Sequence, residues 1–189
     1  MDGFLNLLKP PGMSSGDMVF QARRLLPRGT RVGHGGTLDP DAAGVLPVCV
    51  GRAARLFDYI IDKQKTYIAE LRLGIVTDTQ DASGAVLERR DASFVTEDDV
   101  RAALPRFTGT ISQIPPMYSA LKRGGQKLCD LARKGESVDL EPRPVTIHSI
   151  DYIERRGDTA HLLRVVCGKG TYIRTLCHDI GAALGVGGH

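Results

Sequence analysis

The stretch "PVTIHSIDYIERRGDTAHLLRVVCG", residues 144–168, decides the fold class of this chain. Apolar and polar residues alternate on both sides of Gly157 and Asp158, which is the pattern of two strands joined by a tight turn and therefore running antiparallel. The next stretch, "TYIRTLCHDIGAALG" at residues 171–185, carries apolar residues at helical spacing, with Gly185 as the stop. A hairpin followed by an amphipathic helix predicts an α+β domain rather than a doubly wound parallel sheet.

The remaining elements follow from the same periodicities. Ser14 or Ser15 can cap a helix, and Thr96 followed by Asp99 is a near capping box for a helix through Leu104. Pro115 and Pro116 exclude a central strand because proline has no ladder donor. Further strands are expected within residues 3–9, 45–50, 65–72 and 85–87, and short helices at 53–61 and 127–133.

The overall composition is that of an ordinary globular protein. The 189 residues are 42% hydrophobic and 25% charged, which favours one domain over residues 1–189. A signal peptide and a run of 18 apolar residues are both lacking, so we expect a cytoplasmic protein with no membrane span. The four cysteines form no C-x-x-C pair and are expected to be buried thiols, although Cys177 beside His178 leaves a metal site open.

The charge is more informative in its distribution than in its sum. The formal net charge is only +3, but seven of the 22 acidic residues lie between Asp78 and Asp99, so the rest of the chain is more basic. One basic run spans residues 122–134. From charge alone, a solvated helix face and a phosphate-binding surface explain this run equally well.

The glycine-rich loops match none of the common phosphate or metal motifs. "CGKGTYIRT" lacks the serine or threonine of a Walker A loop, and "DTQDASG" lacks the other oxygen ligands of a calcium loop. Asp39 in "GHGGTLDP" is either a nucleophile on an open loop or an Asx-turn residue, and the residues alone favour the turn. Arg174, beside a glycine turn, is expected to have an anionic partner.

Five blocks of the sequence, in order, carry a family resemblance. They are "LLKPPGMSS", "GHGGTLDPDAAGVLPVCVG", "KTYIAELRLG" with "TDTQDASG", "PPMYSALKRGGQKLCDLARKG" and "CGKGTYIRTLCHDIGAALG". Together they span nearly the whole chain, and they resemble the bacterial tRNA pseudouridine synthase B (TruB) family. The resemblance implies a pseudouridine synthase fold, with a central mixed, largely antiparallel sheet flanked by helices and an RNA-clasping insertion at about residues 122–143.

The resemblance also implies an activity. The family isomerises the T-loop uridine of tRNA, position 55, to pseudouridine by base flipping, which makes the chain an isomerase. Breaking the N1–C1′ bond and joining C5 to C1′ involves no redox change, so no cofactor and no metal are expected. The implied partner is tRNA, bound through its T stem-loop by a monomer that requires no protein partner.

The resemblance assigns roles to individual residues. It makes Asp39 the catalytic nucleophile, Tyr67 the aromatic residue that stacks on the target base, and Arg174 the partner of the catalytic carboxylate. Adding to C1′ and assisting a glycal route both remain open for the carboxylate. The residues expected to contact RNA are His34, Lys9, Lys122, Arg123, Lys127 and Arg133.

The sequence also departs from the family. Gly35, Ala43 and Cys129 replace residues that are common at these positions. The family continues beyond "GGH" with a pocket-lining segment and then a C-terminal RNA-binding (PUA-like) domain, so we expect a truncated chain. Two other functions stay open: a module that binds or folds the tRNA T arm with little turnover, and a small-molecule glycosyl-transfer enzyme supported by Asp39 alone.

Overall fold

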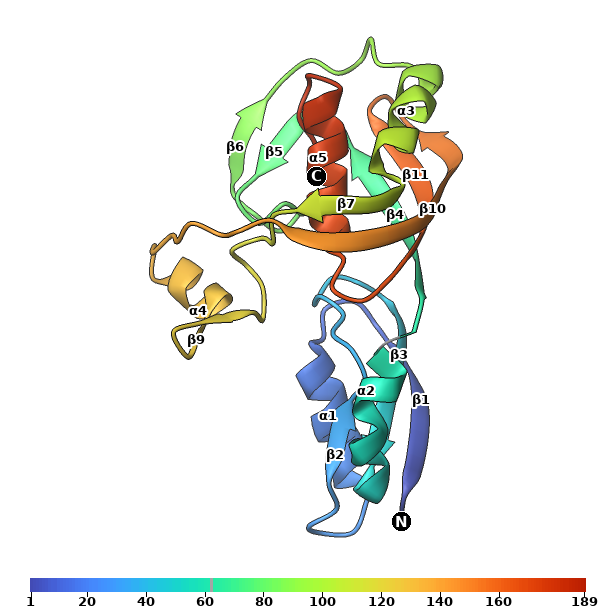
Figure 1. The fold of residues 1–189 in the computed structure, drawn as a ribbon, viewed down its shortest axis with the longest axis vertical. Helices are drawn as coiled ribbons and strands as arrows, with labels where there is room; N and C mark the ends of the chain where they lie inside the picture. Colours follow the sequence, from blue (N-terminus) through green and yellow to red (C-terminus); the bar gives the residue numbers. More distant parts are fainter. Residues whose placement is uncertain (62) are drawn as a thin grey trace. The chain divides into compact units, whose positions relative to one another are not determined.

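The structure is a computed structural model that describes residues 1–61 and 63–189. The chain divides into two compact units, unit 1 at residues 1–63 and unit 2 at residues 64–189 (Figure 1). Each unit has its own hydrophobic cluster. The sequence predicted one domain over residues 1–189, and that stays a prediction. No helix among the described residues is long and apolar enough to cross a membrane.

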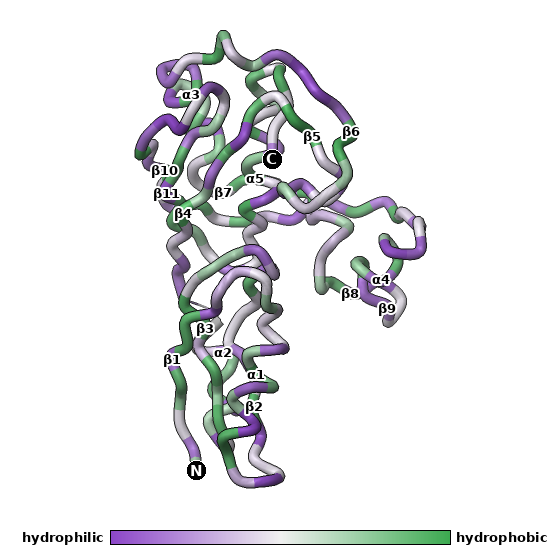
Figure 2. Tube along the Cα trace, turned by 180° about the vertical axis from the view of Figure 1, so that it is seen from behind, coloured by the Kyte–Doolittle hydropathy of each residue, from purple (hydrophilic) through white to green (hydrophobic). Residues whose placement is uncertain are grey.

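Unit 1 is a small antiparallel sheet with one main helix. Strands β1 (Gly3–Lys9), β3 (Gly44–Val50) and β2 (Val32–His34) pair in the order β1-β3-β2. β1 and β3 are mainly hydrophobic along their length (Figure 2). Their inner face packs on helix α1 (Ser15–Arg24), where Val19, Leu46 and Val48 form the core. A 3-10 turn, η1 (Gly51–Leu56), and helix α2 (Phe57–Ile61) follow the sheet.

The start of α1 is fixed by the sequence itself. The Ser14 hydroxyl accepts a hydrogen bond from the Asp17 amide (3.1 Å), and the Asp17 carboxylate accepts one from the Ser14 amide (2.8 Å). This reciprocal capping box satisfies donors that the first helical turn leaves unpaired. Of the two predicted caps, Ser14 is therefore the one used, and Ser15 is free for another role.

Unit 2 is built on a four-stranded antiparallel sheet. β4 (Lys65–Arg72), β11 (Ala160–Cys167), β10 (Arg143–Arg156) and β7 (Gly109–Gln113) pair in that order. β10 and β11 form the predicted hairpin, with Arg156 opposite Ala160 and Gly157 at φ +66° in the turn. That left-handed conformation favours glycine because it has no Cβ.

Helix α5 (Ile173–Ala183) packs on this sheet and forms the centre of the larger core (Figure 1). Its Leu176 and Ile180 are 0% exposed and lie in one cluster with Leu163 of β11. Helix α3 (Glu97–Ala103) and the 3-10 turn η2 (Leu104–Phe107) contribute further buried side chains. Fully burying one such aliphatic side chain contributes about 1.5–3 kcal/mol, so the α5 stripe is a main source of unit 2's stability.

Two small hairpins complete unit 2, and the first of them lies beside α5 (Figure 1). β5 (Ile75–Thr77) pairs with β6 (Val86–Arg89), and β8 (Lys122–Arg123) pairs with β9 (Gln126–Lys127). The second hairpin leads into α4 (Leu128–Arg133), whose Leu128 and Leu131 are buried. The predicted helical turns in the insertion are therefore confirmed.

The α+β prediction is confirmed, with one refinement. Every strand pair among the described residues is antiparallel, where a mixed sheet was expected. Strand β7 was missed because "GTISQ" is short and polar and lies at the sheet edge. Three of the four cysteines, Cys49, Cys167 and Cys177, are buried as predicted, and burial raises the pKa of Cys177 to about 12.

A buried polar pair lies beneath α3. His161 is 0% exposed, and its Nδ1 lies 3.0 Å from the Tyr152 hydroxyl, while its Nε2 has no hydrogen-bond partner. The Arg101 guanidinium stands 4.0 Å from the centroid of the Tyr152 ring. Burial lowers the pKa of His161, and the nearby positive charge of Arg155 acts in the same direction while Glu97 opposes it.

Gly181 of α5 lies directly against the backbone of residues 187–188. A Cβ at Gly181 would lie 2.5 Å from backbone atoms of Gly187 and Gly188. We expect Gly181→Ala to destabilise the protein by about 1–3 kcal/mol through overpacking, although alanine is the better helix former. Urea unfolding measures this, with Ala182→Gly as the exposed control, which should lose up to about 1 kcal/mol. A more stable Gly181→Ala protein would contradict this packing.

His161 predicts a pH dependence of stability. Because its folded pKa is lowered, the unfolded chain binds a proton that the folded chain excludes as the pH falls below about 6.5. The free energy of unfolding should therefore fall between pH 7 and pH 5, and His161→Gln should flatten this slope. The exposed His148→Gln is the matched control and should leave the slope unchanged; equal slopes in all three proteins would refute the assignment.

Candidate active site

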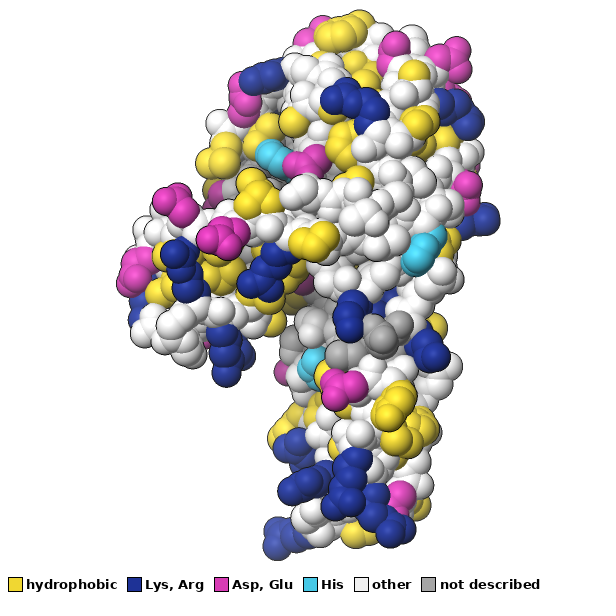
Figure 3. Space-filling view, in the orientation of Figure 1, with side chains coloured by type: hydrophobic (Ala, Val, Ile, Leu, Met, Phe, Trp, Pro, Cys, Tyr) yellow, Lys and Arg dark blue, Asp and Glu magenta, His cyan; other side chains and the backbone are white. Residues whose placement is uncertain are grey.

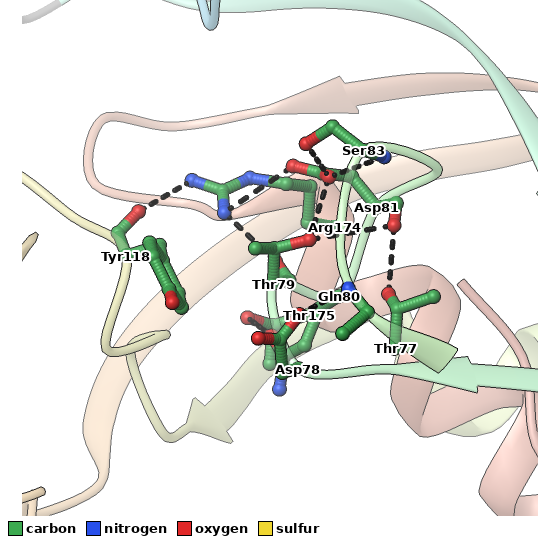
Figure 4. Close-up of polar contacts among 10 residues, drawn as sticks. Thr77, Asp78, Thr79, Gln80, Asp81, Ser83, Tyr118, Arg174 and Thr175 are labelled. Atoms are coloured by element: carbon green, nitrogen blue, oxygen red, sulfur yellow. Dashed lines mark hydrogen bonds and ion pairs between the residues drawn. The ribbon is translucent and has the colours of Figure 1, made fainter. Parts of the chain in front are cut away.

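Arg174, in the first turn of α5, is held by three groups from two other segments. Its guanidinium donates to the carbonyl oxygens of Thr79 and Tyr118, both at 2.9 Å, and lies 3.6 Å from Asp81 Oδ2 (Figure 4). Its side chain is only 14% exposed. A guanidinium presents its donors in a rigid fork, so these contacts fix both its place and its plane.

Asp81 is fixed in turn by the loop between β5 and β6. Its Oδ1 accepts hydrogen bonds from the Thr79 hydroxyl (2.7 Å), the Ser83 hydroxyl (2.6 Å) and the Ser83 amide (3.0 Å). Burial raises the pKa of this carboxyl, but the hydrogen bonds of Ser83 and Thr79 and the charge of Arg174 together outweigh it, so the pKa is lowered. Asp81 therefore stays ionised opposite Arg174.

Further hydrogen bonds join the β5–β6 loop to helix α5 beside the Arg174–Asp81 pair. Gln80 has φ +60°, the one left-handed non-glycine conformation among the described residues, and its Oε1 accepts a hydrogen bond from the Thr175 hydroxyl (2.7 Å). Buried Gln113 of β7 accepts from the Tyr172 amide (2.8 Å) and donates to the Tyr172 carbonyl (3.1 Å). Tyr172 lacks a side-chain cap of its own, so Gln113 anchors the start of α5 just before Arg174.

In unit 1, the backbone on both sides of Asp39 is held by side chains from the start of the chain. The Ser15 hydroxyl accepts from the Leu38 amide (3.0 Å) and donates to the Leu38 carbonyl (3.2 Å). The Pro40 carbonyl accepts from Lys9 Nζ and from the Gly12 amide, both at 2.9 Å. Asp39 itself is exposed, so its carboxylate is presented from a loop with fixed flanks.

Lys9 has a different environment from the one expected of an RNA contact. It is 0% exposed, and its ammonium donates to the carbonyls of Pro10, Met13 and Pro40. All three donors of an ammonium are thereby used within unit 1. The predicted contact with RNA does not fit this burial, and Lys9 instead holds together the turn that follows β1 and the Asp39 loop.

The other predicted site residues are distributed over both units. His34 ends β2 in unit 1, where its Nδ1 contacts the Gly36 carbonyl. Tyr67 lies on β4 opposite Val165 and packs half-buried against the core of unit 2. The predicted ion pair of Arg174 with Asp39 would join the two units and stays a prediction; Asp81 is the carboxylate that unit 2 itself provides.

The predicted basic residues of the insertion are all exposed. Lys122 faces Lys127 directly across the β8–β9 hairpin. Arg123 donates to the Asp139 carbonyl, and Arg133 lies 3.5 Å from Asp130 in a surface pair. Like charges directly opposite each other destabilise a hairpin. An anion bound between Lys122 and Lys127 would reduce their mutual repulsion.

The sequence reasoning missed Asp81 and Ser15. "DTQDASG" was rejected as a calcium loop and used as part of a family block, but no role was given to Asp81, although an aspartate two residues before a serine is an Asx-turn signal. The partner of Asp81, Arg174, is far away in the sequence, and the hydroxyl of Ser15 likewise meets a distant backbone segment. Among the described residues, His, Cys, Asp and Glu form no group of three that could hold a metal ion.

Known proteins with similar sequences support the family that the sequence blocks indicate. Residues 23–173 match the family described as TruB family pseudouridylate synthase (N terminal domain). The tRNA pseudouridine synthase B of Symbiobacterium thermophilum is 54% identical over 100% of this chain and 64% of its own length. That of Heliobacterium modesticaldum is 50% identical over 100% of this chain and 62% of its own length. The chain thus spans less than two thirds of these relatives.

Solved structures share the fold of nearly the whole chain. One chain in the crystal structure of a Cbf5-Nop10-Gar1 complex matches with a TM-score of 0.73 and 34% identity, covering 99% of this chain and 46% of that chain. A chain in the structure of an H/ACA RNP bound to a substrate RNA containing 2′-deoxyuridine matches with a TM-score of 0.69 and 31% identity, covering 99% and 44%. With its sequence match over residues 23–173, the chain belongs to the TruB family of pseudouridylate synthases.

Proposed function

We propose that this chain carries the catalytic residues of an enzyme that isomerises a tRNA uridine to pseudouridine, and that the target is the T-loop uridine at position 55. The relatives that it matches over 62–64% of their length are named tRNA pseudouridine synthase B. The observation that carries the proposal is Asp39, an exposed carboxylate on a loop whose neighbouring residues are hydrogen-bonded on both sides.

The chemistry needs a carboxylate at the ribose. The N1–C1′ bond breaks, the uracil turns without leaving, C5 joins C1′, and the proton on C5 is finally lost while N1 gains one. The Asp39 carboxylate would add to C1′ or assist loss of the C2′ proton, because either route meets an electron-deficient sugar carbon. The product is an isomer of the substrate, the C5 proton goes to water while N1 takes one up, and no redox change occurs, so the reaction requires no cofactor.

Arg174 would supply a fixed positive charge for this reaction. Its three contacts in unit 2 hold the guanidinium before any substrate binds, which is the condition for electrostatic preorganisation. In this proposal it pairs with Asp39 in the working enzyme, and Asp81 is the second carboxylate that positions it. Tyr67 stacks on the uracil once it has left the RNA stack, which offsets part of the unstacking cost.

The basic residues of the insertion would contact the phosphates of the T stem-loop. Lys122 and Lys127, paired across one hairpin, together with Arg123 and Arg133, provide exposed cations on one short segment. His34, at the end of β2, would approach the displaced bases. In this proposal the enzyme works as a cytoplasmic monomer on tRNA. The alternative, a T-arm binding module with little turnover, predicts binding without isomerisation.

Asp39→Ala should abolish isomerisation. With tRNA tritiated at uracil C5, tritium release into water should fall by about a thousandfold or more, because the nucleophile is lost. Asp41→Ala, an equally exposed aspartate two residues away, is the matched control and should retain activity. Release that survives in Asp39→Ala would exclude this nucleophile. If the unaltered chain binds the T arm but releases no tritium, the binding-module alternative is correct.

Arg174→Lys should lower turnover while changing tRNA affinity little. An ammonium has no planar fork and cannot reach the Thr79 and Tyr118 carbonyls and a carboxylate together, so kcat should fall about 10²-fold or more. Arg164→Lys, at an exposed position of β11, is the control and should behave like the unaltered chain. A weaker Kd for tRNA with unchanged kcat would show that Arg174 binds RNA and does not serve the chemistry.

A further inference from the structure

A second group of cations, in unit 1, has no place in the site described above. Five arginines line two neighbouring hollows of about 490 and 610 Å³: Arg23, Arg28, Arg31, Arg52 and Arg55. The hollows share the residues Gly29, Thr30, Arg31 and Ala54, so they form one continuous concave surface. Dark-blue side chains gather on unit 1 in the space-filling view (Figure 3). We call these five residues the arginine cluster.

Two separate chain segments build the cluster. Arg23 lies in the last turn of α1, Arg28 and Arg31 in the connection to β2, and Arg52 and Arg55 in η1. The amide of Gly51 donates to the Arg31 carbonyl (2.7 Å) and ties the two segments together. The fold therefore brings together two arginine-bearing segments that lie far apart in the sequence, one ending at Arg31 and the other beginning at Arg52.

The charges of the cluster are poorly compensated. Asp2 is the single acidic residue that lines the hollows, and its carboxylate binds Arg52 through Nε (2.9 Å) and the amide (2.6 Å). In the part of the chain that the structure describes, this is the one ion pair that involves the cluster. Clustered like charges repel each other and destabilise the folded state, so a bound polyanion would lower the energy of this surface.

Ordinary structural roles account for only part of the cluster. A cation at the end of a helix stabilises the helix dipole, which explains Arg23 in α1. The pair with Asp2 explains Arg52. Arg55 lies in the last turn of η1, where the same helix-end effect applies. Arg28 and Arg31 are exposed and lie outside both explanations. Binding of an anion gives a reason for their place beside the other three arginines at one concave surface.

The composition of the cluster selects phosphate groups as its ligand. All five cations are arginine, whose fork matches phosphate oxygens in a bidentate way. The lining includes no aromatic side chain on which a base could stack, so it fits phosphates rather than unpaired bases. An acidic protein partner fits less well, because the lining offers few large apolar anchors of the kind that protein interfaces use.

We propose that the arginine cluster binds the phosphodiester backbone of a base-paired stem of the RNA substrate, as a second contact separate from the insertion in unit 2. This inference rests on the proposed function for the identity of the RNA as tRNA. It gives the protein a sequence-independent hold on the stem, while the reacting base is recognised elsewhere. Binding of this kind is strongly dependent on salt, because each phosphate contact releases bound counterions.

The test is a triple variant, Arg28→Gln with Arg31→Gln and Arg55→Gln. Its matched control, Arg89→Gln with Arg106→Gln and Arg164→Gln, removes the same charge from exposed positions of unit 2. The Kd for unmodified tRNA is measured at several salt concentrations. We expect the cluster variant to bind about 10- to 100-fold more weakly at 0.1 M salt, and its slope of log K against log salt to shrink by about two to three. The control should stay close to the unaltered chain.

Further measurements separate the possible outcomes. Arg28→Lys with Arg31→Lys and Arg55→Lys keeps the charge and should restore most of the salt slope. Equal Kd values and salt slopes for the cluster variant and the control would overturn the proposal. A competition experiment would also overturn it if polyglutamate, but not duplex RNA, displaced the tRNA from the unaltered chain. If the unaltered chain releases no tritium while the cluster variant still loses tRNA affinity, the proposed activity fails and the cluster stands.

Discussion

The burial of the Arg174 guanidinium is the constraint on which the polar contacts between the β5–β6 loop and the start of α5 depend. A cation that is 14% exposed must be compensated, because removing a charge from water costs several kcal/mol unless partners replace the water. Asp81 supplies the opposite charge, and the carbonyls of Thr79 and Tyr118 take up the other donors. The β5–β6 loop, the Gln80 conformation and the anchor at Gln113 can then be understood as the means of keeping those partners in place.

Unit 1 solves a related problem with Lys9. Its ammonium is fully buried, and three backbone carbonyls replace the water that it loses. One of those carbonyls belongs to Pro40. The hydrogen bond that Lys9 needs in order to be buried therefore also fixes the position of the loop that carries Asp39. Each unit thus uses a buried cation to fix a loop: the Lys9 ammonium fixes the Asp39 loop in unit 1, and the Arg174 guanidinium fixes the β5–β6 loop in unit 2.

The sequence predicted the elements that depend on local chemistry. Gly157 in the hairpin turn, the capping box at Thr96 and the apolar stripe of α5 all lie where the patterns placed them, and Ser14 is one of the two caps that the sequence offered for α1. What it could not predict depends on partners distant in the chain. Asp81 stood in a family block and was rejected as a metal ligand but received no role, Lys9 was expected to contact RNA, and Ser15 was one of two possible caps. Their roles come from tertiary contacts with Arg174, Pro40 and Leu38.

The same reasoning explains why net charge was a poor guide. The sum of +3 combines an acidic stretch at residues 78–99 with cations that the fold collects elsewhere. Part of that acidity is used within the protein: Asp81 compensates Arg174, and Asp99 caps α3. Acidic groups engaged in this way contribute little to the field at distant surfaces, since water and salt screen exposed charges beyond about 10 Å. A polyanion approaching the protein therefore meets local groups of cations, and the number that governs its binding is the charge of each surface rather than that of the chain.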